Sequence, residues 1–283
     1  MPGCQRTQVP ALQRVSARIL AAALGALLLA ATAGAQGSLD FPRQLYNQGR
    51  YDQAITAAAR LRASSLVDGA NVILGRSHLE RFRKTADQAE LVAARAALRE
   101  VNPAHLGPQD RIDYLVGLGE TLYLEESFGP AADLFDSAIE RSRDVGPHAV
   151  ERVFDWWATA LDRQVQSGDA EDSQAIYTAI RDRARAELGR SPGSAAATYW
   201  TVVSLRSLGE LTKAWDCAVA GWVRAPLGDD LGKALRADLD QLVLQAIIPE
   251  RVRVMAAGDR DRERAEAELR AAWEAVKKDW PTK

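Results

Sequence analysis

The side chains that could carry chemistry are few, and they stand apart in the sequence. The chain has three histidines, His78, His105 and His148, and it contains no His-Glu-x-x-His or Cys-x-x-Cys pattern. A zinc site needs several such ligands that converge on one face of the fold. The sequence therefore predicts no metal site and no cofactor, and each histidine is expected on the surface or at a helix end.

Patterns typical of catalysis are also missing from the sequence. The stretch Gly75-Arg76-Ser77-His78-Leu79 superficially resembles a nucleophile elbow, but it lacks the second glycine and lies within a helical pattern. No glycine-rich phosphate-binding loop is present. The adjacent carboxylates Glu125-Glu126 and Asp229-Asp230 would point to different faces of a helix. We therefore expect a protein that is not an enzyme, and a helical enzyme with an unrecognised active site is the least favoured alternative.

The N-terminus has the layout of a secretory signal peptide. Three arginines precede an uncharged apolar run from Ile19 to about Ala33. The run ends in Ala33-Gly34-Ala35, which predicts cleavage before Gln36, with cleavage after Ala33 as an alternative. Because a membrane-spanning helix needs about 20 apolar residues, a retained anchor is the less favoured interpretation. We expect an exported protein, periplasmic or secreted, that meets the membrane only through its signal peptide.

The predicted signal peptide also affects the charge and the cysteines of the remaining chain. It contains Cys4 and three basic residues but no acidic residue, so its removal makes the chain more acidic than the full-length net charge of −2. Nucleic acid is therefore not an expected partner, since it binds basic surfaces. Cys217 would be left without an internal disulfide partner. Its apolar helical surroundings favour a small buried hydrophobe over a disulfide to another chain or a reactive thiol.

The rest of the chain is predicted to be helical throughout. Alanine, leucine, arginine and glutamate dominate, and no alternating strand pattern is found. The segment from Leu115 to Ile139 predicts a pair of helices. Gly119 would let the second helix approach closely, while Ala131, Phe135 and Ala138 form the apolar stripe of that helix.

The spacing of Gly119, Ala131, Phe135 and Ala138 resembles that of tetratricopeptide repeats. Further copies of the pattern cover much of residues 40 to 227; they are Leu45–Leu61, Asn71–Pro103, Val150–Leu188 and Tyr199–Pro226. The resemblance implies an all-α fold, a right-handed α-solenoid of antiparallel helix pairs. The predicted organisation is a signal peptide over 1–35, a repeat array over 36–227 and a C-terminal helical cap over 228–283.

The cap is expected to contain two helical pieces. The first runs from Asp229 to Ile248 and is interrupted or kinked by Pro249. The second carries Trp273 and Trp280 on its apolar stripe. The charged run from Asp259 to Glu268 is expected to be a solvated helix face, with an interaction tail as the alternative.

Aromatic residues supply candidate anchors for a ligand or partner. Most of the seven tryptophans are expected in the core. The neighbours in Trp156-Trp157 and in Tyr199-Trp200 cannot face the same direction on a helix. One ring of each pair is thus either exposed or buried against the next repeat.

The resemblance also implies a function. In tetratricopeptide repeats the first helix of each pair lines a groove that holds peptides or partner helices. The positions of this chain that match the groove are Arg76, Glu120, Tyr123, Tyr199 and Arg206. The Lys and Asn clamp with which some relatives bind a C-terminal carboxylate is not found. We expect an exported scaffold or adaptor that binds a protein or peptide in the cell envelope, for assembly, secretion or transport. The alternative is a helical binding subunit for a small molecule or glycan.

Overall fold

The computed structural model describes residues 38–168, 172–256 and 258–281. Within these ranges the protein consists of helices and turns, without a strand, so the all-α prediction is confirmed. None of the helices in these ranges is both long and apolar enough to cross a membrane. The predicted signal peptide lies outside the described residues.

The chain forms two compact units, which meet in sequence between Leu106 and Gly107. We call them unit 1 and unit 2 and describe each by itself. The α-helices of unit 1 are α2 Asp40–Asn47, α3 Tyr51–Ala59, α4 Val67–Thr85 and α5 Gln88–Arg99. Unit 2 contains α6 Pro108–Leu124, α7 Phe128–Ser142, α8 Pro147–Gln166, α9 Ser173–Arg190, α10 Ala195–Ser207, α11 Leu211–Arg224, α12 Asp229–Leu242, α13 Ile248–Met255 and α14 Asp259–Asp279.

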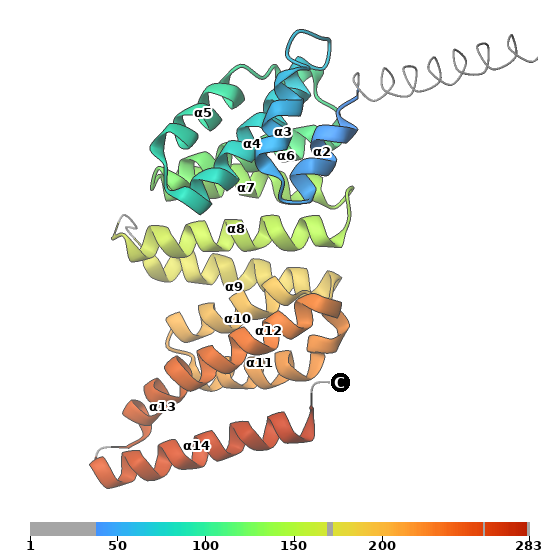
Figure 1. Cartoon of the computed structure of the whole chain (residues 1–283). Helices are drawn as coiled ribbons and strands as arrows, with labels where there is room; N and C mark the ends of the chain where they lie inside the picture. Colours follow the sequence, from blue (N-terminus) through green and yellow to red (C-terminus); the bar gives the residue numbers. More distant parts are fainter. Residues whose placement is uncertain (1–37, 169–171, 257, 282–283) are drawn as a thin grey trace, which may run out of the picture. The chain divides into compact units, whose positions relative to one another are not determined.

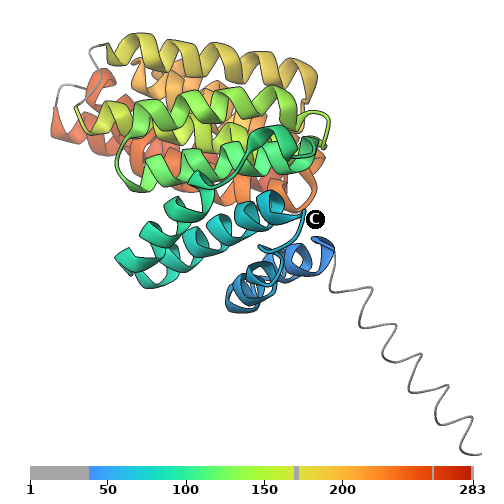
Figure 2. The ribbon, with the colours of Figure 1, turned by 90° about the horizontal axis from the view of Figure 1, so that it is seen from above.

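Helices that follow one another in the sequence pack against each other within each unit. Alternate helices also touch, α2 with α4 in unit 1 and α10 with both α8 and α12 in unit 2. The first helices of two predicted pairs, α8 and α10, therefore form one layer with α12, a helix of the predicted cap. Figure 1 and Figure 2 show the helices of each unit in two views, with colours that follow the sequence.

Three turns between paired helices have the same backbone geometry. Each contains one residue in the left-handed region, at Gly49 with φ 71°, Glu126 with φ 60° and Gly209 with φ 76°. The next amide donates a 2.9 Å hydrogen bond to a carbonyl five positions earlier, in Arg50 to Leu45, Ser127 to Leu122 and Glu210 to Leu205. This pattern ends a helix in the Schellman motif. The same motif thus ends the first helix in three of the predicted pairs.

Small residues let the paired helices approach closely, as the spacing predicts. A Cβ atom added to Gly119 of α6 would lie 2.7 Å from Cε1 of Phe135 on α7. Phe135 and Ala131 are both fully buried. In unit 1, a Cβ on Gly75 of α4 would lie 2.5 Å from Cγ of Leu98 on α5. A larger side chain at either glycine would push the two helices apart.

The C-terminal helices differ from the prediction at Trp280. The predicted interruption at Pro249 takes the form of a π-helical segment over Val243–Ile247, which places the proline in the first turn of α13. The wider i→i+5 register accommodates a residue that has no amide hydrogen. Trp273 is fully buried, whereas Trp280 is 53% exposed. Trp280 lies off the predicted stripe because α14 ends before it, at Asp279.

The charged half of α14 is a solvated helix face, as predicted. Most side chains from Asp259 to Glu268 are exposed. Glu266 and Arg270 form an i,i+4 ion pair on this face, with Arg270 Nη2 at 2.8 Å from Glu266 Oε1. Such exposed pairs stabilise a helix by only about 0.3–0.5 kcal/mol each.

Candidate functional site

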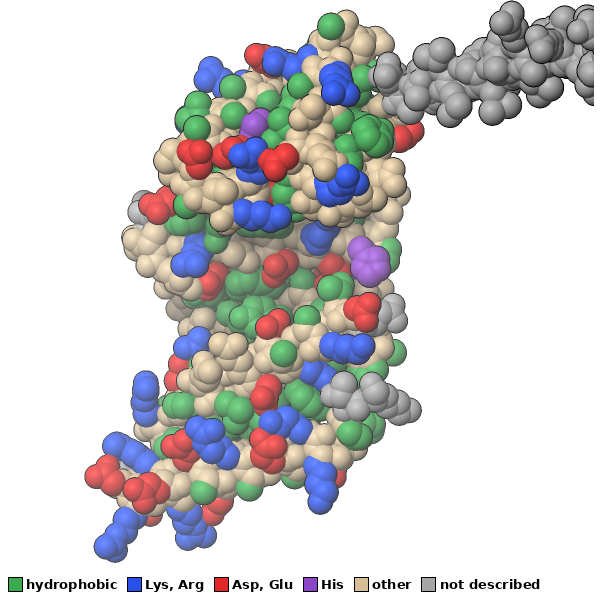
Figure 3. Space-filling view, in the orientation of Figure 1, with side chains coloured by type: hydrophobic (Ala, Val, Ile, Leu, Met, Phe, Trp, Pro, Cys, Tyr) green, Lys and Arg blue, Asp and Glu red, His purple; other side chains and the backbone are tan. Residues whose placement is uncertain are grey.

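A cavity of about 520 Å³ opens in unit 2 along the layer made by α8, α10 and α12. Its walls combine apolar side chains with carboxylates, among them Asp155 and Asp162 of α8, Tyr199 of α10, and Leu231 and Asp238 of α12. In the space-filling view this face is hollowed, with hydrophobic side chains on its floor and acidic side chains around them (Figure 3). The volume lies in the range of about 300–1,000 Å³ that is usual for ligand sites.

The helical repeat explains why these side chains share one face. Asp155 and Asp162 are seven residues apart on α8, and Leu231 and Asp238 are seven apart on α12. Seven residues make about two turns of helix and about 10 Å of rise, so each pair lines the same side of its helix. The cavity wall is therefore elongated along both helices.

Hydrogen bonds from neighbouring helices hold the carboxylates on α8 in place. Asp155 accepts from Nε1 of the buried Trp200 on α10, at 2.8 Å. Asp162 accepts from the hydroxyl of Tyr177 on α9, at 2.7 Å. Glu151 accepts from the amide of Ala196 in the first turn of α10, at 2.9 Å. Since each contact joins two helices, the wall is preorganised by its own packing.

The electrostatics of the cavity disfavour negative charge. The protein surrounding Asp155 displaces water and raises the pKa of this carboxyl group, against the opposing effect of the Trp200 hydrogen bond. The pKa of Asp238 is also raised, first by desolvation and then by repulsion from Asp155. Asp155 and Asp238 therefore interact across the cavity from two different helices.

Tyr199 lies among these charges. Burial raises the pKa of its hydroxyl, and the charges of Asp238, Asp162 and Asp155 raise it further. A neutral tyrosine ring thus stands between carboxylates from α8 and α12. Its ring and hydroxyl offer a contact surface that combines apolar and polar character.

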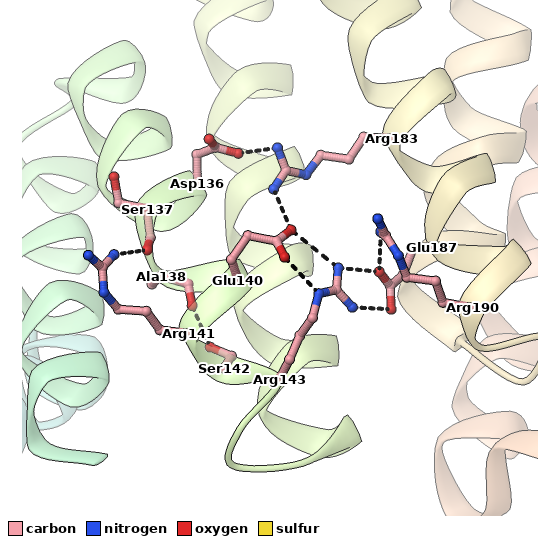
Figure 4. A network of polar contacts seen from close by, with 10 residues as sticks. All are labelled: Asp136, Ser137, Ala138, Glu140, Arg141, Ser142, Arg143, Arg183, Glu187 and Arg190. Carbon is pink, nitrogen blue, oxygen red and sulfur yellow. Dashed lines mark hydrogen bonds and ion pairs between the residues drawn. The ribbon is translucent and has the colours of Figure 1, made fainter. Parts of the chain in front are cut away.

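A network of ion pairs on another face of unit 2 positions α9, which carries Tyr177. Arg143 follows α7 and holds the buried Glu187 of α9 with two hydrogen bonds of 2.7 and 3.2 Å (Figure 4). Glu140 of α7 bonds the same guanidinium at 3.0 Å, and Arg183 of α9 pairs with Asp136 of α7. The hydrogen bond from Arg143 lowers the pKa of Glu140. The network joins α7 to α9, and α9 in turn contacts the cavity wall through the hydrogen bond from Tyr177 to Asp162.

The structure places two of the predicted groove residues at the cavity or beside it. Tyr199 lines the cavity. Arg206, seven residues further along α10, forms hydrogen bonds of 2.6 and 3.0 Å with Glu250 of α13, which raise the pKa of Arg206. Its charge also acts on Tyr199. Arg206 therefore lies near the cavity, with its side chain held by α13.

The other three predicted groove residues are not brought to the cavity. Tyr123 packs at 5.2–5.3 Å against the rings of Phe128 and Trp156, as part of the hydrophobic core. Glu120 is buried at 2% exposure, and Arg76 belongs to unit 1 and is also buried. The guanidinium of Arg76 lies 4.9 Å from the centre of the Tyr46 ring. Their role in a groove stays a prediction.

Sequence reasoning missed the three aspartates of the cavity. Asp155 stands next to Trp156-Trp157, which drew attention to the aromatic side chains, and Asp238 lies in the segment interpreted as a cap. The signal that could have found Asp155 and Asp162 is their seven-residue spacing on a predicted first helix. The structure also answers the question left open by the Tyr199-Trp200 pair, since Trp200 is buried and Tyr199 faces the cavity.

A smaller cavity in unit 1 has a different character. It measures about 270 Å³ and is lined by Arg50, Tyr51, Arg81 and Lys84, among others. Its cations have partners, because Arg81 pairs with Asp52 at 2.6 Å and Lys84 lies 4.5 Å from the centre of the Tyr51 ring. These contacts join α3 to α4 and account for the charged groups as packing interactions.

His78, His105 and Cys217 make contacts within the fold. His78 differs from the surface prediction, since it lies half-buried in the middle of α4 and bonds Glu90 of α5 at 2.6 Å. His105 bonds Asp68 at 2.8 Å. Within the described ranges no group of three or more His, Cys, Asp or Glu side chains is arranged to hold a metal ion. Cys217 is half-buried against the core of unit 2, where burial raises the pKa of its thiol.

Comparison of the chain with protein-family models, with curated proteins and with solved structures found no match.

Proposed function

We propose that this protein is a tetratricopeptide-like scaffold or adaptor that holds a segment of a partner protein in the cavity of α8, α10 and α12. The observation that carries the proposal is the cavity itself, which lies along α8 and α10, the first helices of two predicted pairs, and along α12. In the repeats that the chain resembles, the first helices form the binding surface. Tyr199, a groove position in the sequence, lines the cavity.

The proposed architecture is a right-handed α-solenoid of antiparallel pairs. The Schellman turns at Gly49, Glu126 and Gly209 support it, because they recur at the same place in three pairs. The contacts of α10 with both α8 and α12 support it as well, since stacked repeats touch through equivalent helices. The proposed site of action is the cell envelope, and its support is the basic and apolar pattern ahead of Gln36.

The experiment is an affinity capture from envelope extract of the source organism. The bait is the wild-type chain, compared with a double variant of the cavity, Tyr199→Ala with Leu231→Ala. The matched control is Val254→Ala with Met255→Ala, which removes two side chains that are 80% and 63% exposed and lie outside the cavity wall. We expect one prey protein that is retained by the wild type and the control and lost with the cavity variant. A prey set that is the same for all three baits would contradict the proposal.

A small molecule is the second candidate ligand, because the cavity has a suitable volume and an aromatic wall. Native mass spectrometry of the chain purified from its source distinguishes the two. A bound mass of a few hundred daltons, lost with the Tyr199→Ala and Leu231→Ala variant, would favour a small ligand over a protein partner.

A further inference from the structure

We propose that the cavity recognises an arginine or lysine side chain within an extended basic segment of the partner. The inference rests on the proposed function and adds the chemical class of the occupant. The charges that face the cavity and the span of the cavity from α8 across α10 to α12 support this assignment.

The walls of the cavity carry an excess of negative charge. Four carboxylates line the cavity, those of Glu151, Asp155, Asp162 and Asp238, against two guanidinium groups, those of Arg152 and Arg163. Neither arginine forms an ion pair with another described residue. Arg206, beside the cavity, acts on Asp162 and is itself paired with Glu250. Negative charge therefore remains in excess among the residues that line the cavity.

The four carboxylates differ in how many hydrogen bonds they accept from the protein. Glu151 and Asp162 already accept hydrogen bonds from the protein. Asp155 accepts one, from Trp200, and Asp238 forms no hydrogen bond or ion pair with another described residue. A carboxylate offers about four acceptor sites, so both have capacity left for a donor. A cation between them would also relieve their mutual repulsion.

The lining of the cavity favours one kind of cation over another. A bare metal ion fits poorly, because the carboxylates in the described ranges do not converge as ligands do. An arginine or lysine suits the mixed wall better. Its hydrocarbon stem can lie along Leu231, Ala234 and the ring of Tyr199 while its charged end meets Asp155 and Asp238.

The span of the cavity sets the length of its occupant. The cavity crosses α10 from α8 to α12, and packed helix axes lie about 8–10 Å apart. An extended chain that crosses both spacings needs about five or six residues, at about 3.3 Å each. The geometry thus suits a peptide segment that carries the cation, and a free amine would fill only part of the cavity.

Fluorescence anisotropy with defined probes tests this inference. The probe is a fluorescein-labelled nonapeptide of alternating arginine and alanine, with glutamine and glutamate in place of arginine as two further probes. The proteins are the full chain, the Asp155→Asn and Asp238→Asn double variant, and a matched control of equal charge change, Asp216→Asn with Glu263→Gln. The two control residues are exposed on α11 and α14, outside the cavity wall.

We expect the arginine probe to bind the wild type and the control at least about tenfold more tightly than the double variant, with the glutamine probe weaker and the glutamate probe weakest. Equal binding to the double variant and the control would overturn the inference, because the attraction would then be a property of net charge. Displacement of the probe by spermidine at the same concentration as by unlabelled peptide would also overturn it, in favour of a small amine. Tighter binding of the glutamine probe than of the arginine probe would also overturn the inference. If that binding were lost with Tyr199→Ala, the proposed function would remain intact.

Discussion

The indole nitrogen of Trp200 donates a 2.8 Å hydrogen bond to Asp155, a residue 45 positions earlier in the chain. Trp200 is buried, while Asp155 is exposed to the cavity. A core residue of α10 therefore orients a wall residue of α8.

Removing the donor should weaken unit 2. We expect Trp200→Phe to lower the free energy of unfolding by about 1.5–3 kcal/mol, since a bond to a charged acceptor and some packing are lost. A double-mutant cycle with Asp155→Ala isolates the hydrogen bond. Urea unfolding should give a coupling of about 1 kcal/mol between the two positions. Strictly additive effects would show that the bond does not stabilise the fold.

The carboxylate of Asp238 should make stability fall as pH rises. Its pKa is higher in the folded chain than the ordinary value of 3.8. A group of this kind binds protons more tightly when folded, so its stabilising contribution is complete below pH 3.8 and disappears as pH rises through the raised pKa. We expect Asp238→Asn to be more stable than the wild type at pH 7, with the advantage shrinking toward pH 3.5. Urea midpoints at the two pH values check this, with Asp216→Asn as the control. A difference in urea midpoint between Asp238→Asn and the wild type that stays constant or grows toward pH 3.5 would contradict a raised pKa for Asp238.

Loss of the buried carboxylate of the ion network should lower the free energy of unfolding more than loss of the exposed one. The side chain of Glu187 is only 6% exposed, and that of Glu140 is 63% exposed. Glu187→Gln leaves the Arg143 charge without its main buried partner, so we expect a loss of about 2–3 kcal/mol. The matched change Glu140→Gln should cost less than about 1 kcal/mol. Chemical denaturation of the two variants measures the difference, and equal losses would refute this ranking.

Glu126 occupies a backbone position that suits glycine. It has φ 60° in the same turn where Gly49 and Gly209 stand in the other pairs. Glu126→Gly should therefore raise the free energy of unfolding by about 0.5–1 kcal/mol, because the left-handed conformation is costly for a residue with a Cβ atom. The reciprocal change Gly209→Ala should lower it by about 1 kcal/mol. Thermal unfolding of both variants provides the check, and a destabilised Glu126→Gly would exclude the equivalence of the turns.

Much of the fold could be predicted because the sequence marks it locally. Gly119 and Phe135 lie at the spacing of two helices that cross closely, and they meet in the structure as expected. Pro249 indicated an interruption of the helix, but no local signal in the sequence indicated that the interruption would be a π-helical segment. Trp280 follows the apolar period of α14 but lies beyond its end, where the period no longer applies.

The candidate site was predictable only in part. Tyr199 could be found because its position follows from the turn at Gly209, in a copy with a well-marked register. Glu120 follows from the same kind of count, but it is buried. A periodic pattern specifies the face of a helix, while the exposure of that face depends on what packs over it. Asp155 and Asp238 are 83 positions apart in the sequence, and they line one cavity only because the fold brings α8 and α12 together.

The central claim is that the partner occupies the cavity of α8, α10 and α12. Site-specific photocrosslinking tests it most directly, with the photoreactive residue p-benzoylphenylalanine placed at Leu231 in the cavity wall or at Val254 outside it. Irradiation in the envelope should give one discrete adduct from position 231 that disappears with Tyr199→Ala, and no such adduct from position 254. The same adduct from both positions, or an adduct from position 254 alone, would contradict the account.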